Sequence, residues 1–228
     1  MNVIVSRDNE KLKLVRKLHD RRWRDKLGLF VAEGEDLVDA AIRAGIEPVE
    51  LLVAGESVAP ELLAEVSSLA HPPRVLGVFR QEDLPRAPLP PVGLALWHVG
   101  DPGNVGTLLR AADALGPAFA ALSPGCADPT GPKALRASMG AVFRVPICAF
   151  DEAPGRRVGL VAQGGVPLPE LELEGPVLFL LGAERDGLPE ELLATADATA
   201  SIPQAHGAES LNVALAGAIA LYELTRRA

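Results

Sequence analysis

The sequence lacks long apolar runs, a cysteine pattern and metal-ligand spacings. No apolar stretch has the length and flanks of a membrane-spanning helix or a signal peptide, so we expect a cytoplasmic protein that does not contact membranes. The two cysteines, Cys126 and Cys148, lie far apart in the chain, which favours two reduced, buried thiols over a disulfide. Cys and His are not spaced as metal ligands, and we expect no bound metal.

Positive charge is also scarce, because 22 Lys and Arg face 30 Asp and Glu, for a net charge of −8. The deficit is uneven along the chain. Residues 1–30 hold nine Lys and Arg against four Asp and Glu, whereas the remainder holds thirteen against twenty-six. A polyanion responds to the local distribution of charge more than to the sum. We therefore expect any polyanion contact at the N-terminal end.

Apolar runs of strand length alternate with runs of helix length through the 228 residues. This alternation predicts an α/β fold with a largely parallel sheet. The length fits one large domain or two small ones. A proline-rich stretch at 84–91 cannot form a regular element and favours extended backbone. We expect a small αβ domain over 1–80, a linker over 81–91 and a second domain over 92–228.

Three segments of the second domain share one build: an apolar run, a loop with Gly or Pro, and a helix. Their loops cover residues 100–106, 182–188 and 203–210. The helix after the third loop, 211–224, is apolar almost all round, which predicts a buried helix. Polar loops between strands and helices are where α/β proteins place their chemistry. We therefore expect these loops to form the functional site.

Each loop carries a short pattern. These are Asn-x-Gly with an Arg four residues on, Gly-x-Glu-x-x-Gly-Leu, and Ile-Pro followed by Glu-Ser-Leu-Asn-Val. The matching residues are Asn104, Gly106 and Arg110, then Gly182, Glu184, Gly187 and Leu188, then Ile202, Pro203 and 209–213. In this order, from residue 92 to the C-terminus, they resemble the SpoU (TrmH) family of RNA ribose 2′-O-methyltransferases in the SPOUT class.

The resemblance implies a deep trefoil knot, S-adenosylmethionine as methyl donor, and a homodimer through the second domain. It implies a catalytic set of Arg110, Asn104, Glu184, Ser210 and Asn212. Loops rich in Gly let backbone approach a ligand, so residues 162–165, 181–188 and 202–211 are candidate walls for the donor. Within them we expect donor contacts from Ala162, Gln163, Gly164, Leu181, Gly182, Gly187, Ile202, Ser210 and Leu211.

Several of these residues have a plainer interpretation. Asn104, Ser210 and Asn212 are all types that cap helices, and Glu184 can be an ordinary turn acid. His206 is interpreted as a solvent-exposed loop residue. Many family members carry Ser after the Asn-Val of the third motif, where this chain has Ala214. Small residues along this helix would allow close helix packing.

Arg110 carries the main chemical expectation. Methylating a ribose hydroxyl requires aligning the hydroxyl with the methyl group and helping to remove its proton. A guanidinium is a poor base, because its pKa lies above about 12. We expect Arg110 to hold the substrate phosphate and polarise the hydroxyl, either over the Asn104 turn or in the partner's site. The alternative is a surface arginine.

Residues 9–26 predict one basic helix. For Trp23 we favour a packing anchor over a base-stacking platform. Ordinary solvated charges are the alternative to RNA contacts at the basic residues of this helix and of the second domain. The expected RNA contacts are Lys11, Lys13, Arg16, Lys17, Arg21, Arg22, Arg24, Lys133 and Arg136.

The remainder of 1–80 has an αβαβαβ layout that resembles the ribosomal-protein-like, L30e-type domain of many SpoU enzymes, which helps to hold rRNA. We expect this unit to be too small to share the core of the second domain. The predicted function is 2′-O-methylation of 23S rRNA. A tRNA enzyme and a non-catalytic RNA-binding or ribosome-assembly protein are alternatives. The spacing of the glycines at 100, 103 and 106 disfavours a dinucleotide-binding oxidoreductase.

Overall fold

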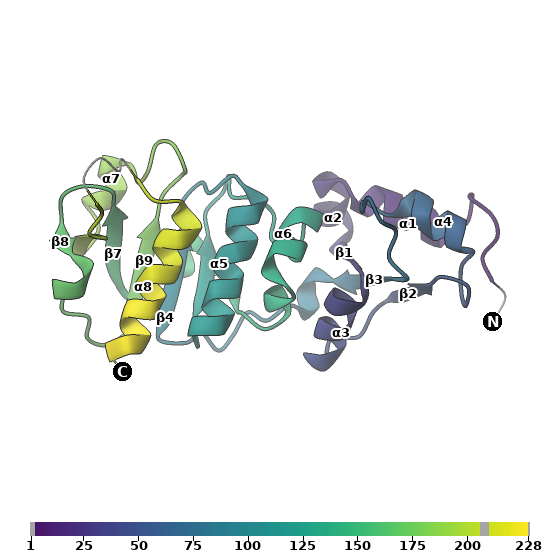
Figure 1. Ribbon diagram of the computed structural model, residues 1–228, viewed down its shortest axis with the longest axis horizontal. Coiled ribbons are helices and arrows are strands. Elements are labelled where there is room, and N and C mark those ends of the chain that lie inside the picture. Colours follow the sequence, from purple (N-terminus) through teal and green to yellow (C-terminus); the bar gives the residue numbers. More distant parts are fainter. Residues whose placement is uncertain (1–2, 206–209, 228) are drawn as a thin grey trace.

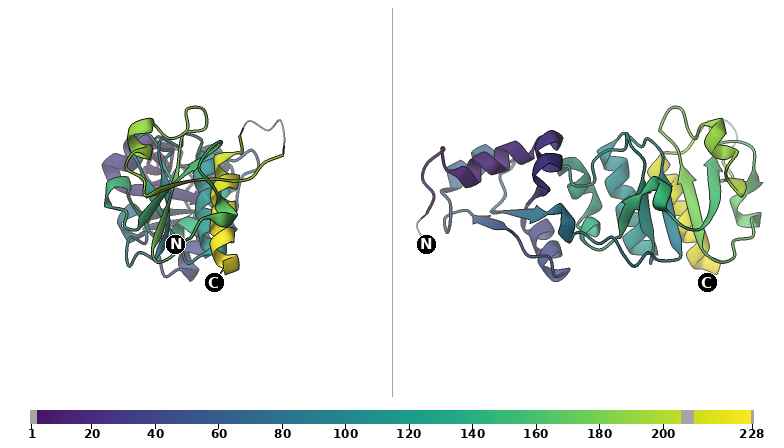
Figure 2. Two further views of the ribbon diagram at one scale, coloured as in Figure 1. Left: turned by 90° about the vertical axis from the view of Figure 1, so that its left-hand side faces the viewer. Right: turned by 180° about the vertical axis from the view of Figure 1, so that it is seen from behind.

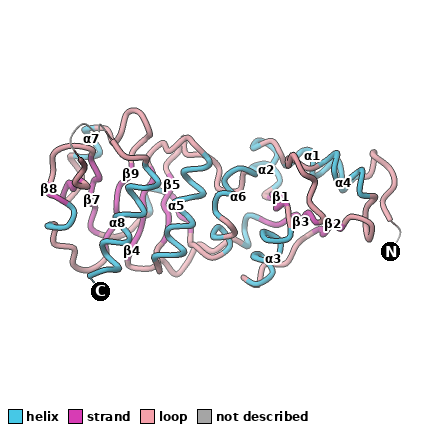
Figure 3. The backbone as a smooth tube through the Cα atoms, in the orientation of Figure 1, coloured by secondary structure: helices cyan, strands magenta, loops and turns pink. Residues whose placement is uncertain are grey.

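The computed structural model describes residues 3–205 and 210–227. These residues form an elongated molecule with two sheets placed one after the other along its length (Figures 1 and 3). The first sheet is antiparallel and has the order β1-β3-β2. Its strands are β1 (Leu29–Glu33), β2 (Glu50–Val53) and β3 (Val75–Arg80).

Four helices accompany this sheet: α1 (Glu10–Leu18), α2 (Arg21–Leu27), α3 (Glu35–Arg43) and α4 (Pro60–Val66). The prediction of one helix over 9–26 is wrong, because the chain breaks between α1 and α2. Asn9 caps α1, and the side chain of Asp20 accepts a hydrogen bond from the N–H of Arg22 and caps α2. An aspartate in extended backbone ends one helix and starts another.

The second sheet has seven strands in the order β6-β5-β4-β9-β7-β10-β8, and all its pairings are parallel. The predicted α/β fold with a largely parallel sheet is confirmed. The deep trefoil knot stays a prediction. The strands are β4 (Val92–Leu96), β5 (Phe119–Leu122), β6 (Ile147–Ala149), β7 (Arg156–Val161), β8 (Val166–Pro167), β9 (Val177–Leu181) and β10 (Ala198–Ser201).

Helices α5 (Pro102–Leu115) and α8 (Val213–Arg227) lie side by side on one face of this sheet (Figure 1). Gly217 makes this contact close, since a Cβ at that position would overlap Leu108 of α5. The remaining helices are α6 (Pro132–Ser138) and α7 (Glu190–Leu193). Short 3₁₀ segments cover Gln81–Asp83, Ala141–Phe143, Phe150–Glu152 and Leu168–Glu170.

The prediction that α8 is a buried helix is only half right. Its inner face, including Ala214 and Gly217, is buried. Its outer face carries Leu215, Ile219 and Tyr222, which are 55%, 38% and 56% exposed. These three residues follow the spacing of one helical stripe, and we call them the α8 stripe.

The expectation that the N-terminal unit is too small to share the core of the second domain is only half right. One apolar cluster belongs to the N-terminal unit alone, but another is shared with the second domain. Phe30 of β1 and Phe79 of β3 pack against Phe143 of the second domain, with ring centroids 6.1 and 5.7 Å away. All three rings are buried in one apolar cluster that extends into both sheets. The proline-rich segment is also attached, because the Pro85 and Pro91 carbonyls accept hydrogen bonds from Ile147 and Val177.

Both cysteines are unpaired; Cys126 is buried, whereas Cys148 is only half-buried. Within residues 3–205 and 210–227, no helix is long and apolar enough to cross a membrane. No group of three or more His, Cys, Asp or Glu side chains in these same residues is placed to hold a metal ion.

Candidate active site

Parallel strands bring the predicted loops to one edge of the second sheet. β4, β9, β7 and β10 are consecutive neighbours and run in the same direction. Their carboxyl ends therefore lie at one edge, and each continues into one of the loops that the sequence singled out. Figure 2 shows this edge of the molecule from behind, together with helices α1 and α2.

The first motif lies inside a helix rather than in a turn before it. The Asp101 side chain accepts hydrogen bonds from the N–H groups of Gly103 and Asn104, and Pro102 occupies the first helical position. These are strong helix-start signals, so α5 begins five residues before the predicted start at 107. Asn104 is therefore not a cap, and that alternative is wrong.

The three motifs meet through a chain of side-chain hydrogen bonds. The Asn104 amide donates to Glu184 Oε1 at 2.9 Å, and the Asn212 amide donates to Asn104 Oδ1 at 3.1 Å. Asn212 Oδ1 also accepts from the N–H groups of Ala214 and Leu215, so this residue caps α8 as well. We call Glu184, Asn104 and Asn212 the motif network.

Glu184 also accepts hydrogen bonds from the backbone N–H groups of Gly100 and Asp101, at 3.3 and 3.2 Å. Desolvation raises the pKa of its carboxyl, but the Asn104 amide and the backbone N–H groups together lower that pKa below its ordinary value. Glu184 is therefore an anion that accepts hydrogen bonds at neutral pH. It holds the start of α5 against the loop after β9.

The glycines of the second motif are needed for its turn. The backbone of Ala183 both donates to and accepts from Gly187, at 3.1 and 3.0 Å. Gly187 has φ +66°, and a Cβ on Gly182 would overlap the Gly187 backbone. A side chain at either position would open the turn or strain it. This turn directs the Glu184 side chain toward α5.

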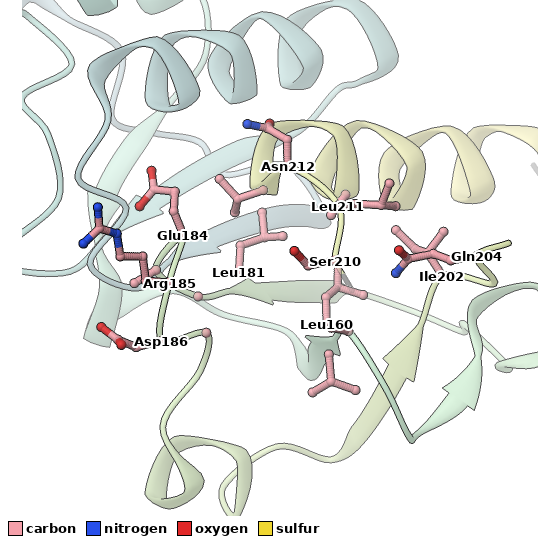
Figure 4. Close-up of a pocket in the computed structure, with 17 residues that line it drawn as sticks. Leu160, Leu181, Glu184, Arg185, Asp186, Ile202, Gln204, Ser210, Leu211 and Asn212 are labelled. Atoms are coloured by element: carbon pink, nitrogen blue, oxygen red, sulfur yellow. The ribbon is translucent and has the colours of Figure 1, made fainter. Parts of the chain in front are cut away.

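A cavity of about 590 Å³ lies beside the motif network. Figure 4 shows Glu184 and Asn212 toward one end and Ile202 and Gln204 toward the other, with Ser210 between them. Of the expected donor contacts, all but Gln163 and Gly164 line it. The lining residues are Leu160, Val161, Ala162, Leu181, Gly182, Ala183, Glu184, Arg185, Asp186, Gly187, Ile202, Gln204, Ser210, Leu211, Asn212, Val213 and Ala216.

Five lining residues lie outside the walls expected from the sequence; Asn212 was expected in the catalytic set, and the other four were missed. Leu160 and Val161 are the last residues of β7, and Val213 and Ala216 lie in the first turn of α8. The signal that could have found them is positional. The end of a strand and the inward positions of a first helical turn flank any loop between strand and helix. His206 and Glu209 lie outside the described residues.

Arg110 stands apart from this site. Its side chain is exposed and makes no hydrogen bond or ion pair with any described residue. Six residues of α-helix place it about 120° around the α5 axis from Asn104. The expected reach over the Asn104 turn within one chain is therefore not what the structure shows. Arg110 instead lies on an exposed face of α5.

One expected RNA contact must be corrected. Arg24 is 4% exposed, and its guanidinium donates to Asp128 at 2.7 Å and to the carbonyls of Leu18 and His19. It joins α2 to the second domain instead of facing solvent. Arg21 also donates to the carbonyl of Cys126.

The other expected RNA contacts are exposed or half-buried, but most have protein partners. Lys11 pairs with Glu50, Lys13 with Glu10 and Lys133 with Asp101, while Arg16 and Arg136 donate to Arg7 and Ser68. The hydrogen bond from Lys133 is the main reason that the pKa of the Asp101 carboxyl is lowered. Lys17 and Arg22 form no ion pair or side-chain hydrogen bond with the described residues.

The fold is shared with solved RNA-modifying enzymes. An S-adenosylmethionine-bound rRNA methyltransferase from Sinorhizobium meliloti aligns with 99% of this chain and 97% of its own, at TM-score 0.88 and 32% identity. The SpoU methyltransferase AviRb from Streptomyces viridochromogenes aligns with 96% of this chain and 98% of its own, at TM-score 0.85 and 26% identity. The fold and site thus define an RNA methyltransferase of the SPOUT class.

The sequence comparisons give the family. The SpoU rRNA methylase family matches residues 91–222, and the MRM3-like substrate-binding domain matches residues 9–81. The 23S rRNA (guanosine(2553)-2′-O)-methyltransferase RlmP of Bacillus subtilis is 33% identical over 98% of this chain and 99% of its own length. The chain belongs to the SpoU rRNA methylase family, and the predicted family and enzyme class are confirmed.

Proposed function

We propose that the protein transfers a methyl group from S-adenosylmethionine to a ribose 2′-hydroxyl of large-subunit rRNA. The observation that carries this proposal is the motif network, because it fastens three distant loops beside one cavity. RlmP and the Sinorhizobium enzyme support rRNA as the substrate class, since both match nearly the whole chain. A structure concerned with 2-OH methylation of tRNA matches 60% of it.

The cavity has the chemistry that the donor needs. Leu160, Leu181 and Ile202 offer apolar walls for an adenine ring, and the turn at Gly182 lets backbone groups approach a ligand. Gln204 Oε1 is buried without a hydrogen-bond partner in the part of the chain that the structure describes. An N–H or O–H group of a ligand would satisfy it. The bound donor supplies a methyl group activated by its sulfonium centre.

We assign the remaining chemistry to Arg110, the motif network and Ser210. Arg110 holds the phosphate next to the target ribose and polarises the hydroxyl, since a guanidinium keeps its proton near neutral pH. Glu184, Asn104 and Asn212 keep the loops in place around the donor. Ser210 lies on the cavity wall and is exposed, so its hydroxyl is available to the donor or the nucleotide.

Arg110 acts in the partner's site of a homodimer. The α8 stripe is exposed on α8, Arg110 is exposed on α5, and these two helices lie side by side (Figure 1). Exposed apolar residues aligned on a helix are typical of an association surface. We propose that a second copy covers the stripe and extends across α5 to Arg110. Ala214 and Gly217, by contrast, pack inward against the protein's own core.

We assign different roles to the two domains. Residues 1–80 hold the RNA, residues 81–91 connect, and residues 92–228 bind the donor and carry out the reaction. The RNA contacts we retain are Lys11, Lys13, Arg16, Lys17, Arg21, Arg22, Lys133 and Arg136. We propose a cytoplasmic location, which a bacterial relative such as RlmP of Bacillus subtilis supports.

The test uses in-vitro-transcribed 23S rRNA incubated with the protein, with and without S-adenosylmethionine. Sites of 2′-O-methylation are mapped by resistance of the neighbouring phosphodiester to alkaline hydrolysis. We expect donor-dependent protection at a defined ribose. Calorimetry with S-adenosylmethionine alone tests the rival, a non-catalytic RNA-binding protein. Absence of both donor binding and protection would overturn the proposal in favour of that rival.

A further inference from the structure

Trp23 of α2 is not the packing anchor that the sequence suggested. Its side chain is half-buried. It belongs to none of the three apolar clusters formed by the described residues, and it is not among the partly buried side chains packed against them. The other tryptophan, Trp97, does pack against such a cluster. A large apolar ring left partly in water without core contacts needs another explanation.

Three cations surround the Trp23 ring. Lys17 Nζ lies 5.2 Å and Lys26 Nζ 5.1 Å from the ring centroid, and Arg22 Cζ lies 6.0 Å away. In residues 3–205 and 210–227 none of the three forms an ion pair or a side-chain hydrogen bond. The ring attracts each cation weakly, whereas the three like charges repel one another. This arrangement favours an anionic ligand.

Elsewhere in the described part of the first domain the cations are paired or hydrogen-bonded, with the exception of Arg43 on α3. Lys11 and Lys13 of α1 contact Glu50 and Glu10, and Arg74 contacts Glu56. The nearby acids are also engaged, since Asp25 faces Arg21 and Asp20 caps α2. Lys17, Arg22 and Lys26 therefore stand out from their surroundings. With Trp23 we call them the Trp23 platform.

The platform is fixed relative to the active site. Arg24, on the opposite side of the same helix, is bound to Asp128 of the second domain, with both side chains at most 9% exposed. In Figures 1 and 2, α2 lies at the same edge of the molecule as the loops that carry the motif network. An RNA strand that contacts α2 can therefore continue along this edge toward the site.

We propose that the Trp23 platform binds an unpaired nucleotide of the RNA substrate. A base stacks on the indole face, and Lys17, Arg22 and Lys26 move from the ring to the flanking phosphates. Aromatic stacking with basic side chains around it is how proteins hold single-stranded RNA. The proposal deepens the proposed function by naming a single-stranded element as part of the substrate.

The stacking test compares Trp23→Leu with the unaltered protein, using an oligouridine 20-mer and a 20-base-pair RNA duplex as probes. Filter binding gives Kd for each. We expect Trp23→Leu to weaken the single strand about 5- to 150-fold and the duplex far less. RNA should also quench tryptophan fluorescence in the unaltered protein more than in Trp23→Leu. Equal loss for both probes, or no loss with the fold intact by circular dichroism, would overturn stacking.

The charge test compares two double variants of equal charge change. Lys17→Gln with Lys26→Gln removes two unpaired cations, whereas Arg7→Gln with Arg74→Gln removes two cations of the same domain that are paired with Glu65 and Glu56 and lie outside the expected RNA contacts. For the single strand, log K falls linearly as log salt rises. The first double variant should lower the steepness of this fall by about 1.4, at about 0.7 per phosphate contact. The second should lower it much less. Equal slopes in the two variants would contradict the platform.

Calorimetry with S-adenosylmethionine separates this proposal from the enzyme assignment. The platform variants should bind the donor as the unaltered protein does, because Trp23 does not line the donor cavity. If no variant binds donor or methylates RNA, the function fails while the Trp23 effect on RNA affinity can still stand. If methylation proceeds but Trp23→Leu binds both probes normally, only the platform fails.

Discussion

The motif network and the Trp23 platform treat polar groups in opposite ways. Asn104, Glu184 and Asn212 satisfy one another across three loops. Around Trp23, three cations lack partners among the residues described. In our proposal, groups that must hold a geometry are paired within the protein, whereas groups that bind a polyanion are left to the ligand. The difference separates a site organised for chemistry from a surface organised for capture.

The contact between the domains explains how the two regions can work together. It combines an apolar part, Phe30 and Phe79 against Phe143, with the buried pair of Arg24 and Asp128. Gln81 adds a hydrogen bond to Thr130, which itself donates to Asp128. Such a mixed, buried contact fixes the position of a small domain better than a flexible linker would.

Loss of the buried pair should have the largest effect. Arg24→Ala leaves Asp128 buried without its cation, and we expect about 3–5 kcal/mol less free energy of unfolding. Urea unfolding of the whole chain measures this loss. Arg22→Ala, on the same helix but exposed, should cost at most about 0.5 kcal/mol. Combining Arg24→Met with Asp128→Leu should recover much of the loss, and a loss below that of Arg22→Ala would contradict the assignment.

Arg110→Ala should abolish most of the activity without altering the fold. Removal of one group that stabilises transition-state charge typically costs about 10²–10³ in kcat. Rates of methyl transfer to rRNA provide the measurement, with circular dichroism and light scattering for fold and dimer. Arg43→Ala on α3 removes an exposed arginine away from the site and serves as the control. Full activity in Arg110→Ala would refute its role.

Mixed dimers decide whether Arg110 acts in the partner's site. Alone, Arg110→Ala and Asn104→Ala dimers should each keep about a tenth of full activity or less. In a mixed dimer, the subunit with intact Asn104 receives Arg110 from the other, so one site is complete. Random exchange between the two variants should restore about a quarter of full activity. No recovery after verified exchange would place Arg110 in the site of its own chain.

Asn104→Ala removes the centre of the motif network and leaves Glu184 and Asn212 without each other. Hydrogen bonds to charged groups contribute about 1.5–3 kcal/mol, so kcat/KM should fall about 10- to 100-fold. Thr107→Ala is the matched control, because Thr107 bonds only to the Gly103 carbonyl within α5. Equal rates for the two variants would show that the network does not matter for catalysis.

The sequence predicted the strands and the three loops well because both depend on local patterns. Apolar runs set β4, β9 and β10, and glycines set the turn before Gly187. It failed where one side chain had a distant partner. In the sequence, Arg24 is one basic residue among many. Only in the folded chain does Asp128 lie next to it. Phe143 likewise gives no local sign that it will join Phe30.

Helix starts were the other weakness. The glycines at 103 and 106 made the first turn of α5 hard to predict, because glycine is a poor helix former. Gly106 is there for packing, as a Cβ on it would overlap the Ala134 carbonyl of α6. The direction in which the Arg110 side chain points depends on where α5 begins, so the late expected start also affected that prediction. The outward stripe on α8 was missed because an apolar helix with one exposed face looks the same in sequence as one buried all round.

The smallest expected effect concerns the charge of Glu184. Its pKa is lowered in the folded protein despite desolvation, chiefly through the Asn104 amide. A lowered pKa adds stability above the unfolded value of about 4.3 and loses it as pH falls through the folded value. The stability difference between the unaltered protein and Glu184→Gln should thus be constant from about pH 7 to 5 and shrink below about pH 4. Urea unfolding across this range measures it, with Asp186→Asn as control, because Asp186 lies in the same turn without a hydrogen bond to the described residues. A difference that grows as pH falls would mean that the network prefers a protonated Glu184.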